Sequence, residues 1–246
     1  MRLANDVSRS AFLFTSIKLF VYIYQMEFSI TIIIIIITVV VSIGAFNNQK
    51  TMEDLIFYPP AVSQRNQWYR FFSCGLIHAD WGHLIFNMLA LYLFGSNLEE
   101  YFKYVFAEKA KMLYLVMYVA ALAVSVLPTY FKNRNNYSYR SLGASGAVSA
   151  VIFSSILFNP LTGIGLFFIP IYIAGFVFGF VYLLISHYLD KRGGDNINHS
   201  AHLWGAVFGL AFTIVAGYAF SEYGILDGFI EQIKNMDPKD IIQFGR

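Results

Sequence analysis

Long apolar runs separated by short polar stretches are the main pattern of this chain, and they predict a helical membrane protein. A run of about 20 apolar residues spans the hydrocarbon core of a bilayer as a helix. We expect six transmembrane helices, at residues 28–46, 82–98, 112–130, 144–159, 163–187 and 200–220. The expected fold class is therefore an all-α membrane protein, built as a bundle of six transmembrane helices.

The same pattern divides the chain into three parts. Residues 1–26 combine basic residues with a short apolar stretch, which indicates a cytoplasmic or interfacial tail. Residues 27–220 form the six-span domain, and residues 221–246 form a polar tail of mixed charge. The long aromatic connection at residues 47–77 is expected in the headgroup zone of the membrane.

Composition agrees with a membrane protein. Of the 246 residues, 57% are hydrophobic and 13% are charged, whereas soluble domains average about 25% charged residues. The formal net charge of +2 gives no indication of a nucleic-acid partner, and the single cysteine, Cys74, excludes an internal disulfide. Lysines and arginines divide nine to eight between the two sets of loops, so the positive-inside rule does not assign an orientation.

Three polar residues stand at the starts of predicted spans that point the same way. Consecutive spans alternate in direction, so the second, fourth and sixth spans all begin on one face of the membrane. His83 lies in the first turn of the second span, Ser145 in that of the fourth, and His202 near the start of the sixth. Polar side chains at membrane depth are costly and face the protein interior. We therefore expect these three residues to meet on one side of the bundle.

Ser145 lies within the sequence Gly-Ala-Ser-Gly-Ala, residues 143–147, where a hydrolase would hold a nucleophile. A serine hydroxyl needs an adjacent general base, and His202 is the best candidate. Gly205 and Gly209 give the sixth span a small face that allows close approach to a matching small face of the fourth span. Taken alone, the glycines could be ordinary packing positions and His202 a buried polar residue.

His83 and Asn87 are four residues apart and share a helix face, so both can direct hydrogen-bond donors to one point. The backbone N–H of Ser145 lacks a partner at the start of a helix and supplies another donor. Together these groups could form an oxyanion hole for a tetrahedral intermediate. The alternative is that His83 and Asn87 bond only to nearby loops.

A metal centre is the chemical alternative, because His78, Asp80 and His83 lie close together in sequence. Their spacing lacks the His-Glu-x-x-His pattern of helix-borne zinc hydrolases. His199 is a further possible ligand, which we expect at the membrane interface instead. We expect neither a metal ion nor any other cofactor.

Together these residues resemble the rhomboid family of intramembrane serine proteases. The similar segments are HADWGHLIFN at residues 78–87, GASG at residues 143–146, AHLWG at residues 201–205 with Gly209, and the pair Trp68 and Arg70. The resemblance covers about residues 57–220, and the order and spacing of several motifs make it specific.

The resemblance implies a function and a set of site residues. Ser145 would be the nucleophile and His202 its general base, in a dyad without a carboxylate. His83, Asn87 and the N–H of Ser145 would form the oxyanion hole. The fifth helix would border a lateral entrance, and the substrate would be a transmembrane segment of another membrane protein, cut near the membrane surface at a small residue.

This chain departs from the family at one position. Many rhomboids carry an aromatic residue four positions after the nucleophile, packed against the catalytic histidine, whereas this chain has Ser149. We expect another aromatic residue, such as Trp204 or Tyr172, to position His202.

Two other functions stay open on the sequence. The family includes inactive relatives, so a pseudoprotease that binds membrane helices without cutting them is the main alternative. A small transporter is less favoured, because the predicted spans lack a buried charge pair and the chain lacks the repeat of duplicated halves. From bacterial-type members we expect a prokaryotic plasma membrane, with a cytoplasmic amino terminus and a site that opens outward. The expected partners are transmembrane substrates and the lipid bilayer.

Overall fold

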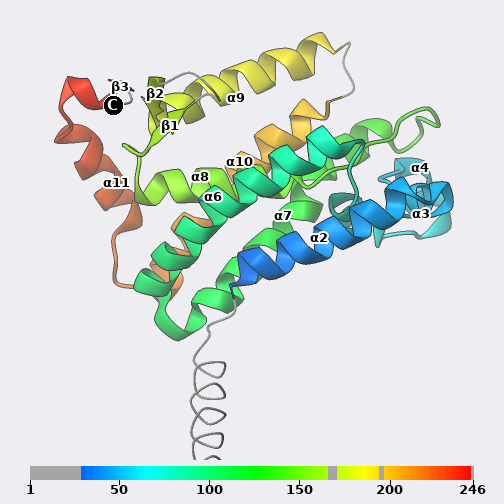
Figure 1. Ribbon diagram of the computed structural model, residues 1–246, viewed down its shortest axis with the longest axis horizontal. Coiled ribbons are helices and arrows are strands. Elements are labelled where there is room, and N and C mark those ends of the chain that lie inside the picture. Colours follow the sequence, from blue (N-terminus) through cyan, green and yellow to red (C-terminus); the bar gives the residue numbers. More distant parts are fainter. Residues whose placement is uncertain (1–28, 166–170, 194–196, 245–246) are drawn as a thin grey trace, which may run out of the picture.

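A computed structural model describes residues 29–165, 171–193 and 197–244, which are mostly helical (Figure 1). The α-helices are α2 (Ile30–Phe46), α3 (Gln49–Leu55), α4 (Pro59–Arg65), α5 (Arg70–Ser73), α6 (Trp81–Phe106), α7 (Ala110–Asn133), α8 (Ser145–Phe158), α9 (Gly175–Arg192), α10 (His199–Phe220) and α11 (Ile225–Lys234). Short 3-10 helices are η1 (Cys74–Leu76), η2 (Ala107–Lys109) and η3 (Pro238–Asp240). The strands β1 (Gly163–Gly165), β2 (Ile171–Ala174) and β3 (Ile242–Phe244) form an antiparallel sheet in the order β1-β2-β3.

Each predicted span contains a helix, and helices α2, α6, α7, α8 and α10 pack together in one bundle (Figure 1). In the described part of the chain, two helical stretches, Trp81–Asn133 and His199–Phe220, are long and apolar enough to cross a bilayer by length and composition. Helices α2 and α8 are apolar but shorter, with 17 and 14 residues. The mostly helical fold is confirmed, whereas the number of six membrane crossings stays a prediction.

The fifth predicted span, residues 163–187, is wrong at its start. Strands β1 and β2 lie in this segment, and α9 begins only at Gly175 and continues to Arg192. The Ile-Tyr-Ile sequence of β2 favours an extended chain, because β-branched and aromatic side chains fit a pleated surface. Hydrophobicity alone does not separate a short buried strand from a helix. The fold is therefore helical with a small sheet, and not purely all-α.

The polar tail packs against the helical domain. Helix α11 contacts α8, and its Ile225 is 4% exposed and lies against Gly217 of α10. Strand β3 pairs with β2, with Ile242 opposite Ile173. Figure 1 shows α11 and the three strands together at one end of the bundle, away from α3 and α4. The predicted amino-terminal tail, residues 1–26, lies outside the described residues.

Helix α8 is the most enclosed helix of the bundle and packs against α6, α7 and α10. Its buried side chains include the small residues Ala147, Ala150 and Ser154, which let neighbouring helices approach closely. The Ser154 hydroxyl donates to the carbonyl of Gly209 at 3.0 Å and accepts from Thr213 at 2.8 Å. Hydrogen bonds as well as close packing thus join α8 to α10.

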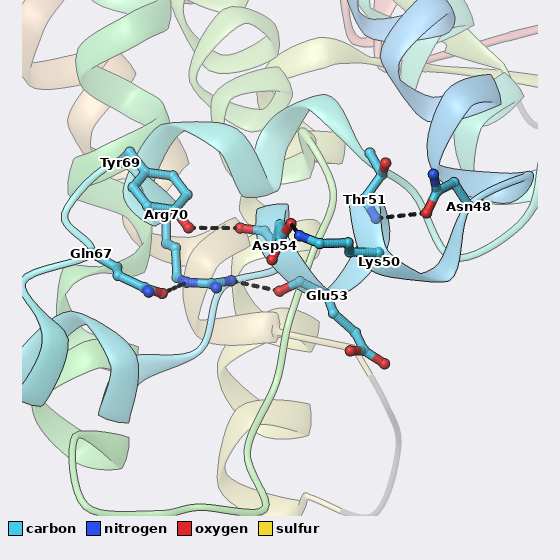
Figure 2. A network of polar contacts seen from close by, with 8 residues as sticks. All are labelled: Asn48, Lys50, Thr51, Glu53, Asp54, Gln67, Tyr69 and Arg70. Carbon is cyan, nitrogen blue, oxygen red and sulfur yellow. Dashed lines mark hydrogen bonds and ion pairs between the residues drawn. The ribbon is translucent and has the colours of Figure 1, made fainter.

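The connection between α2 and α6 is folded into the short helices α3, α4 and α5 and is held by Arg70 (Figure 2). Arg70 is 6% exposed, and its guanidinium donates to the backbone carbonyls of Glu53 at 2.8 Å and Ile56 at 2.6 Å. Its Nε donates to the side-chain oxygen of Gln67 at 2.6 Å. A buried cation needs such partners, so Arg70 fixes the shape of this connection.

Candidate active site

Ser145 and His202 come from different helices and form a direct hydrogen bond, with 2.8 Å between Oγ and Nε2. Ser145 is the first residue of α8, and His202 lies in the first turn of α10. The argument from alternating span directions predicted that these residues would meet. In this geometry the imidazole can accept the hydroxyl proton and so activate the oxygen as a nucleophile.

Two glycines of α10 allow this short distance. A Cβ atom at Gly205 would lie 2.7 Å from the carbonyl carbon of Gly146, and one at Gly209 would lie 2.6 Å from Cα of Ala150. Real Cβ atoms almost never approach other atoms so closely, so a larger residue at either position would push the helices apart. The predicted contact between small faces of the fourth and sixth spans is confirmed.

Side-chain caps set the starts of the two helices that carry site histidines. Asp80 accepts from the N–H of His83 at 2.8 Å and caps α6. Asn198 accepts from the N–H of Ala201 at 3.1 Å and caps α10. Asn198 also accepts from the hydroxyl of Thr129 at 3.1 Å, which ties the start of α10 to α7. Such caps stabilise a helix start by about 1 kcal/mol.

Helix α8 starts differently, because its N-cap residue is Ala144 and makes no side-chain cap. In the turn before it, Gly143 has a φ of 112°, in the region that favours glycine. The Gly143 N–H donates to the carbonyl of Cys74 at 2.9 Å, and an antiparallel bridge joins Ser141 to Phe57. The turn is thus fixed by backbone bonds, and within the described residues no side-chain hydrogen bond from the N-cap residue satisfies the first N–H groups of α8.

The imidazole of His83 packs against this turn. A Cβ atom at Gly143 would lie 2.6 Å from Cε1 and 2.9 Å from Nε2 of His83, so only glycine leaves room for the ring. The N–H of Ala79 is 3.5 Å from Nδ1, a weak contact that favours a proton on Nε2. The structure therefore brings His83 to the segment that leads into Ser145, with a ring nitrogen suited to donate.

Asn87 lies one turn further along α6 and is 7% exposed. Its amide nitrogen donates to the backbone carbonyl of His83 at 2.9 Å, which is the local bonding that the alternative interpretation expects. An Asn amide carries two N–H groups, and this bond uses one of them. The role of Asn87 as a donor to a reacting group stays a prediction.

His78 has a structural role that the sequence analysis missed. It is fully buried, its Nδ1 is 3.0 Å from the hydroxyl of Ser42, and its Nε2 accepts from the N–H of Ala144 at 3.5 Å. Its ring meets that of His83 at an angle of 74°, with 4.9 Å between centroids. Burial, and next the neighbouring His83, lower the pKa of His78 to about 3. His78 therefore braces the residue before Ser145 as a neutral imidazole.

The ring that stacks on His202 belongs to Tyr182 of α9. The two ring centroids are 6.2 Å apart and the planes differ by 23°. The phenol oxygen of Tyr182 lies 3.1 Å from the hydroxyl of Ser149, which stands where many rhomboids carry an aromatic residue. Of the two candidates named from sequence, Tyr172 instead lies in β2 at the other end of α8, and Trp204 is 44% exposed.

Residue spacing did contain a signal for Tyr182. The buried residues of α9 are Gly175, Gly179 and Ser186, and Tyr182 falls on the same stripe at helical spacing. His199, expected at the membrane interface, is buried and meets His202 edge-on, with 5.8 Å between ring centroids. In the described part of the chain, no three His, Cys, Asp or Glu side chains are grouped so that they could hold a metal ion.

A small cavity and a much larger one lie toward opposite ends of the described bundle. A cavity of about 20 Å³ adjoins Ser145, is lined by polar groups of Ser125 and Asn198, and has room for about one water molecule. A larger cavity of about 950 Å³ lies beside Glu99, near the far end of α6. Glu99 accepts from the N–H of Ile30 at 2.5 Å and caps α2. The larger cavity is therefore remote from the serine–histidine pair.

Comparison with known proteins agrees with this arrangement. A family model described as the Rhomboid domain matches residues 65–219. The mitochondrial RHOMBOID-like protein 12 of Arabidopsis thaliana is 33% identical over 141 residues, which cover 52% of this chain and 40% of that protein. Rhomboid-like protein 15 of the same plant is 27% identical over 178 residues, covering 66% of this chain and 40% of that protein. The putative rhomboid protease YdcA of Bacillus subtilis is 28% identical over 101 residues, which cover 39% of this chain and 46% of that protein.

These relatives bear on the membrane in which the protein resides and on how much of each protein the match covers. They include mitochondrial and chloroplastic plant proteins as well as a bacterial one, so the expectation of a prokaryotic plasma membrane finds no support. The matched regions span about 40% of the length of the first two relatives. The Rhomboid model, however, covers more than half of this chain, from the α2–α6 connection into α10, and the chain belongs to the rhomboid family.

Proposed function

We propose that this protein is an intramembrane serine protease in which Ser145 is the nucleophile and His202 the general base. The observation that carries the proposal is the 2.8 Å hydrogen bond between Ser145 Oγ and His202 Nε2 within a bundle of apolar helices. Membership of the rhomboid family supports an intramembrane protease, and one bacterial relative is named a putative rhomboid protease.

The first chemical step would be acylation. Ser145 Oγ attacks the carbonyl carbon of the scissile peptide while His202 Nε2 takes the hydroxyl proton. The protonated imidazole then gives this proton to the leaving amine as the C–N bond breaks, and an ester to Ser145 remains. Hydrolysis repeats the sequence, with water as the nucleophile and His202 as its base, and regenerates the free serine.

The negative charge of each tetrahedral intermediate would be met by donors around the start of α8. The N–H of Ser145 lies at a helix terminus that no side chain of the described residues caps, where backbone donors and the positive end of the helix favour an anion. His83, which packs against Gly143, and Asn87 would add side-chain donors. Removal of one such donor typically lowers kcat by about 10² to 10³.

The surroundings of the dyad support a substrate class. Exposed apolar side chains on α6 and α9, such as Phe86 and Phe180, leave these helices suited to lipid or to another transmembrane helix. We propose that the substrate is a transmembrane segment that enters beside α9 and is cut near the membrane surface. No cofactor takes part in the proposed chemistry.

Cleavage by the purified protein tests this proposal. A generic transmembrane substrate is incubated with wild type, Ser145→Ala and Ser155→Ala in detergent, and each protein is labelled with a fluorophosphonate. Ser155 lies on the same helix and is 7% exposed, so its substitution is a matched control. We expect cleavage and labelling by wild type and Ser155→Ala, and neither by Ser145→Ala.

Two results would contradict parts of the proposal. Full cleavage by Ser145→Ala would exclude Ser145 as the nucleophile. Binding of the transmembrane substrate without cleavage, together with no fluorophosphonate labelling of wild type, would identify a pseudoprotease that holds membrane helices.

A further inference from the structure

Tyr182 connects the serine–histidine pair to α9, a helix that has few deeply buried residues. Its ring lies near the His202 imidazole, with centroids 6.2 Å apart, and its hydroxyl bonds to Ser149 of α8. Phe153 and Phe178 flank the phenol ring, at centroid distances of 5.8 Å and 6.1 Å. One side chain of α9 thus contacts the general base, α8 and two aromatic neighbours.

The helices that carry the dyad offer no carboxylate that could orient the imidazole. Neither α8 nor α10 contains an acidic residue. In Ser-His-Asp enzymes the carboxylate fixes the orientation of the histidine and stabilises the imidazolium that forms during reaction. A tyrosine ring stacked on the imidazole restricts its rotation, and its face attracts a cation at about 6 Å. Tyr182 can therefore supply both effects, although more weakly than a carboxylate.

The buried residues of helix α9 are small. Its buried positions are Gly175, Gly179 and Ser186, and Tyr182 is the large side chain on that stripe. The opposite face is exposed and apolar, as at Phe180 and Leu184. A displacement of α9 would therefore carry the Tyr182 ring away from His202 while the contact between α8 and α10 persists.

We infer that Tyr182 is the positioning residue for His202 and that it makes the competence of the dyad depend on the position of α9. The inference rests on the proposed function, because it concerns the general base of that reaction. Ser149 is its complement: a small side chain there leaves space for the ring of Tyr182 and bonds to its hydroxyl. The ring that orients the histidine is thus carried by α9 instead of α8.

Substitutions at 182 and 149 separate the ring from its hydroxyl. Tyr182→Ala removes the ring, Tyr182→Phe keeps it without the bond to Ser149, and Tyr182→Leu keeps bulk without an aromatic face. Tyr188→Ala is the matched control, because Tyr188 is on the same helix and 62% exposed. The double variant Ser149→Tyr with Tyr182→Ala moves the ring to α8.

The rate of Ser145 labelling by fluorophosphonate and the kcat and KM for a transmembrane substrate are measured for each variant. We expect Tyr182→Ala and Tyr182→Leu to lower kcat and the labelling rate by roughly 10- to 100-fold, since misplacement by about 1 Å can cost 10². KM should change little. Tyr182→Phe and Tyr188→Ala should stay near wild type, and the double variant should recover part of the loss.

A second readout does not depend on activity. In proton–carbon NMR of labelled histidines, the ring of Tyr182 should shield His202, and His202→Gln identifies its signal. We expect the chemical shift of this signal to move downfield in Tyr182→Ala and to match wild type in Tyr188→Ala. In the double variant it should return toward the wild-type value. The signal also reports folding of each variant.

The two readouts distinguish the failure of this inference from that of the proposed function. Wild-type labelling together with an unchanged rate and an unchanged His202 signal in Tyr182→Ala would overturn the role of Tyr182 and leave the protease intact. Absence of wild-type labelling, with a His202 signal that responds to Tyr182→Ala and not to Tyr188→Ala, would overturn the protease and keep the positioning contact.

Discussion

Replacement of Gly205 by alanine tests whether the approach of α8 and α10 sets the geometry of the dyad. The added Cβ would lie 2.7 Å from the carbonyl carbon of Gly146, whereas carbon atoms in contact are separated by about 3.5 to 4.0 Å. The neighbouring atom belongs to the backbone and has no rotamer to change. The helices must therefore move apart by about 1 Å at this level.

His202 lies less than one turn from Gly205, so the separation of the helices also increases the distance between Ser145 and His202. If α8 and α10 separated along the direction of the hydrogen bond, the Oγ–Nε2 distance would increase from 2.8 Å to about 3.8 Å. That is beyond the range of an ordinary hydrogen bond. A misplacement of this size can lower a rate by about 10². Overpacking of a well-packed core also costs about 1 to 3 kcal/mol of stability.

The assay combines the rate of fluorophosphonate labelling with the thermal midpoint in detergent. We expect Gly205→Ala to lose about 100-fold in labelling rate and to melt earlier than wild type. Gly209→Ala, one turn further from the dyad and against Ala150, should lose comparable stability and less of the rate. In the control, Gly44→Ala, nothing lies within 4 Å of the added Cβ, so both measurements should match or exceed wild type. A wild-type labelling rate in Gly205→Ala would refute the argument.

Two further predictions follow from single side chains. Asn87→Ala should lower kcat by about 10² to 10³ with little change in thermal midpoint, as measured on a transmembrane substrate; an unchanged kcat would remove Asn87 from the oxyanion hole and leave the dyad in place. Burial raises the pKa of Cys74 to about 12, so only about 10⁻⁴ of the thiol is ionised at pH 8. A maleimide should therefore label Cys74 quickly in denatured protein and very slowly in folded protein, and fast labelling of the folded form would contradict its burial. Because the folded-state pKa is the higher one, the stability contribution of this thiol is complete below about pH 8.5 and is lost as the pH rises toward 12.

Helices α2, α6, α7, α8, α9 and α10 were predictable because each lies in a long apolar run. The prediction was wrong where one run contained three elements, since residues 163–187 include the strands β1 and β2 before α9. Hydrophobicity indicates burial or lipid contact, and an apolar segment can meet either condition as a helix or as a strand. The pairing of β2 with β3 depends on residues about 70 positions later in the chain, which a local pattern does not contain.

The meeting of Ser145 and His202 was predictable for a different reason. The alternation of span directions placed Ser145 and His202 on one face without any knowledge of side-chain contacts, and a small-residue face then brought their helices together. His78 and Tyr182 were missed because their roles exist only across elements. A buried histidine in a loop resembles a possible ligand, and one tyrosine among many aromatic residues resembles lipid contact, until the contacts with Ala144 and His202 are known.

The three helix starts at the site differ in a way that the proposed chemistry requires. Asp80 and Asn198 cap α6 and α10 and so hold their first turns, which carry His83 and His202. The start of α8 has Ala144 at the capping position, which forgoes a contribution of about 1 kcal/mol. Its uncapped donors are the ones that an oxyanion at Ser145 would use, because a side-chain cap would occupy them. The close packing of the α10 glycines and the backbone bonds of the preceding turn hold this helix start without using the donors that a reacting anion would need.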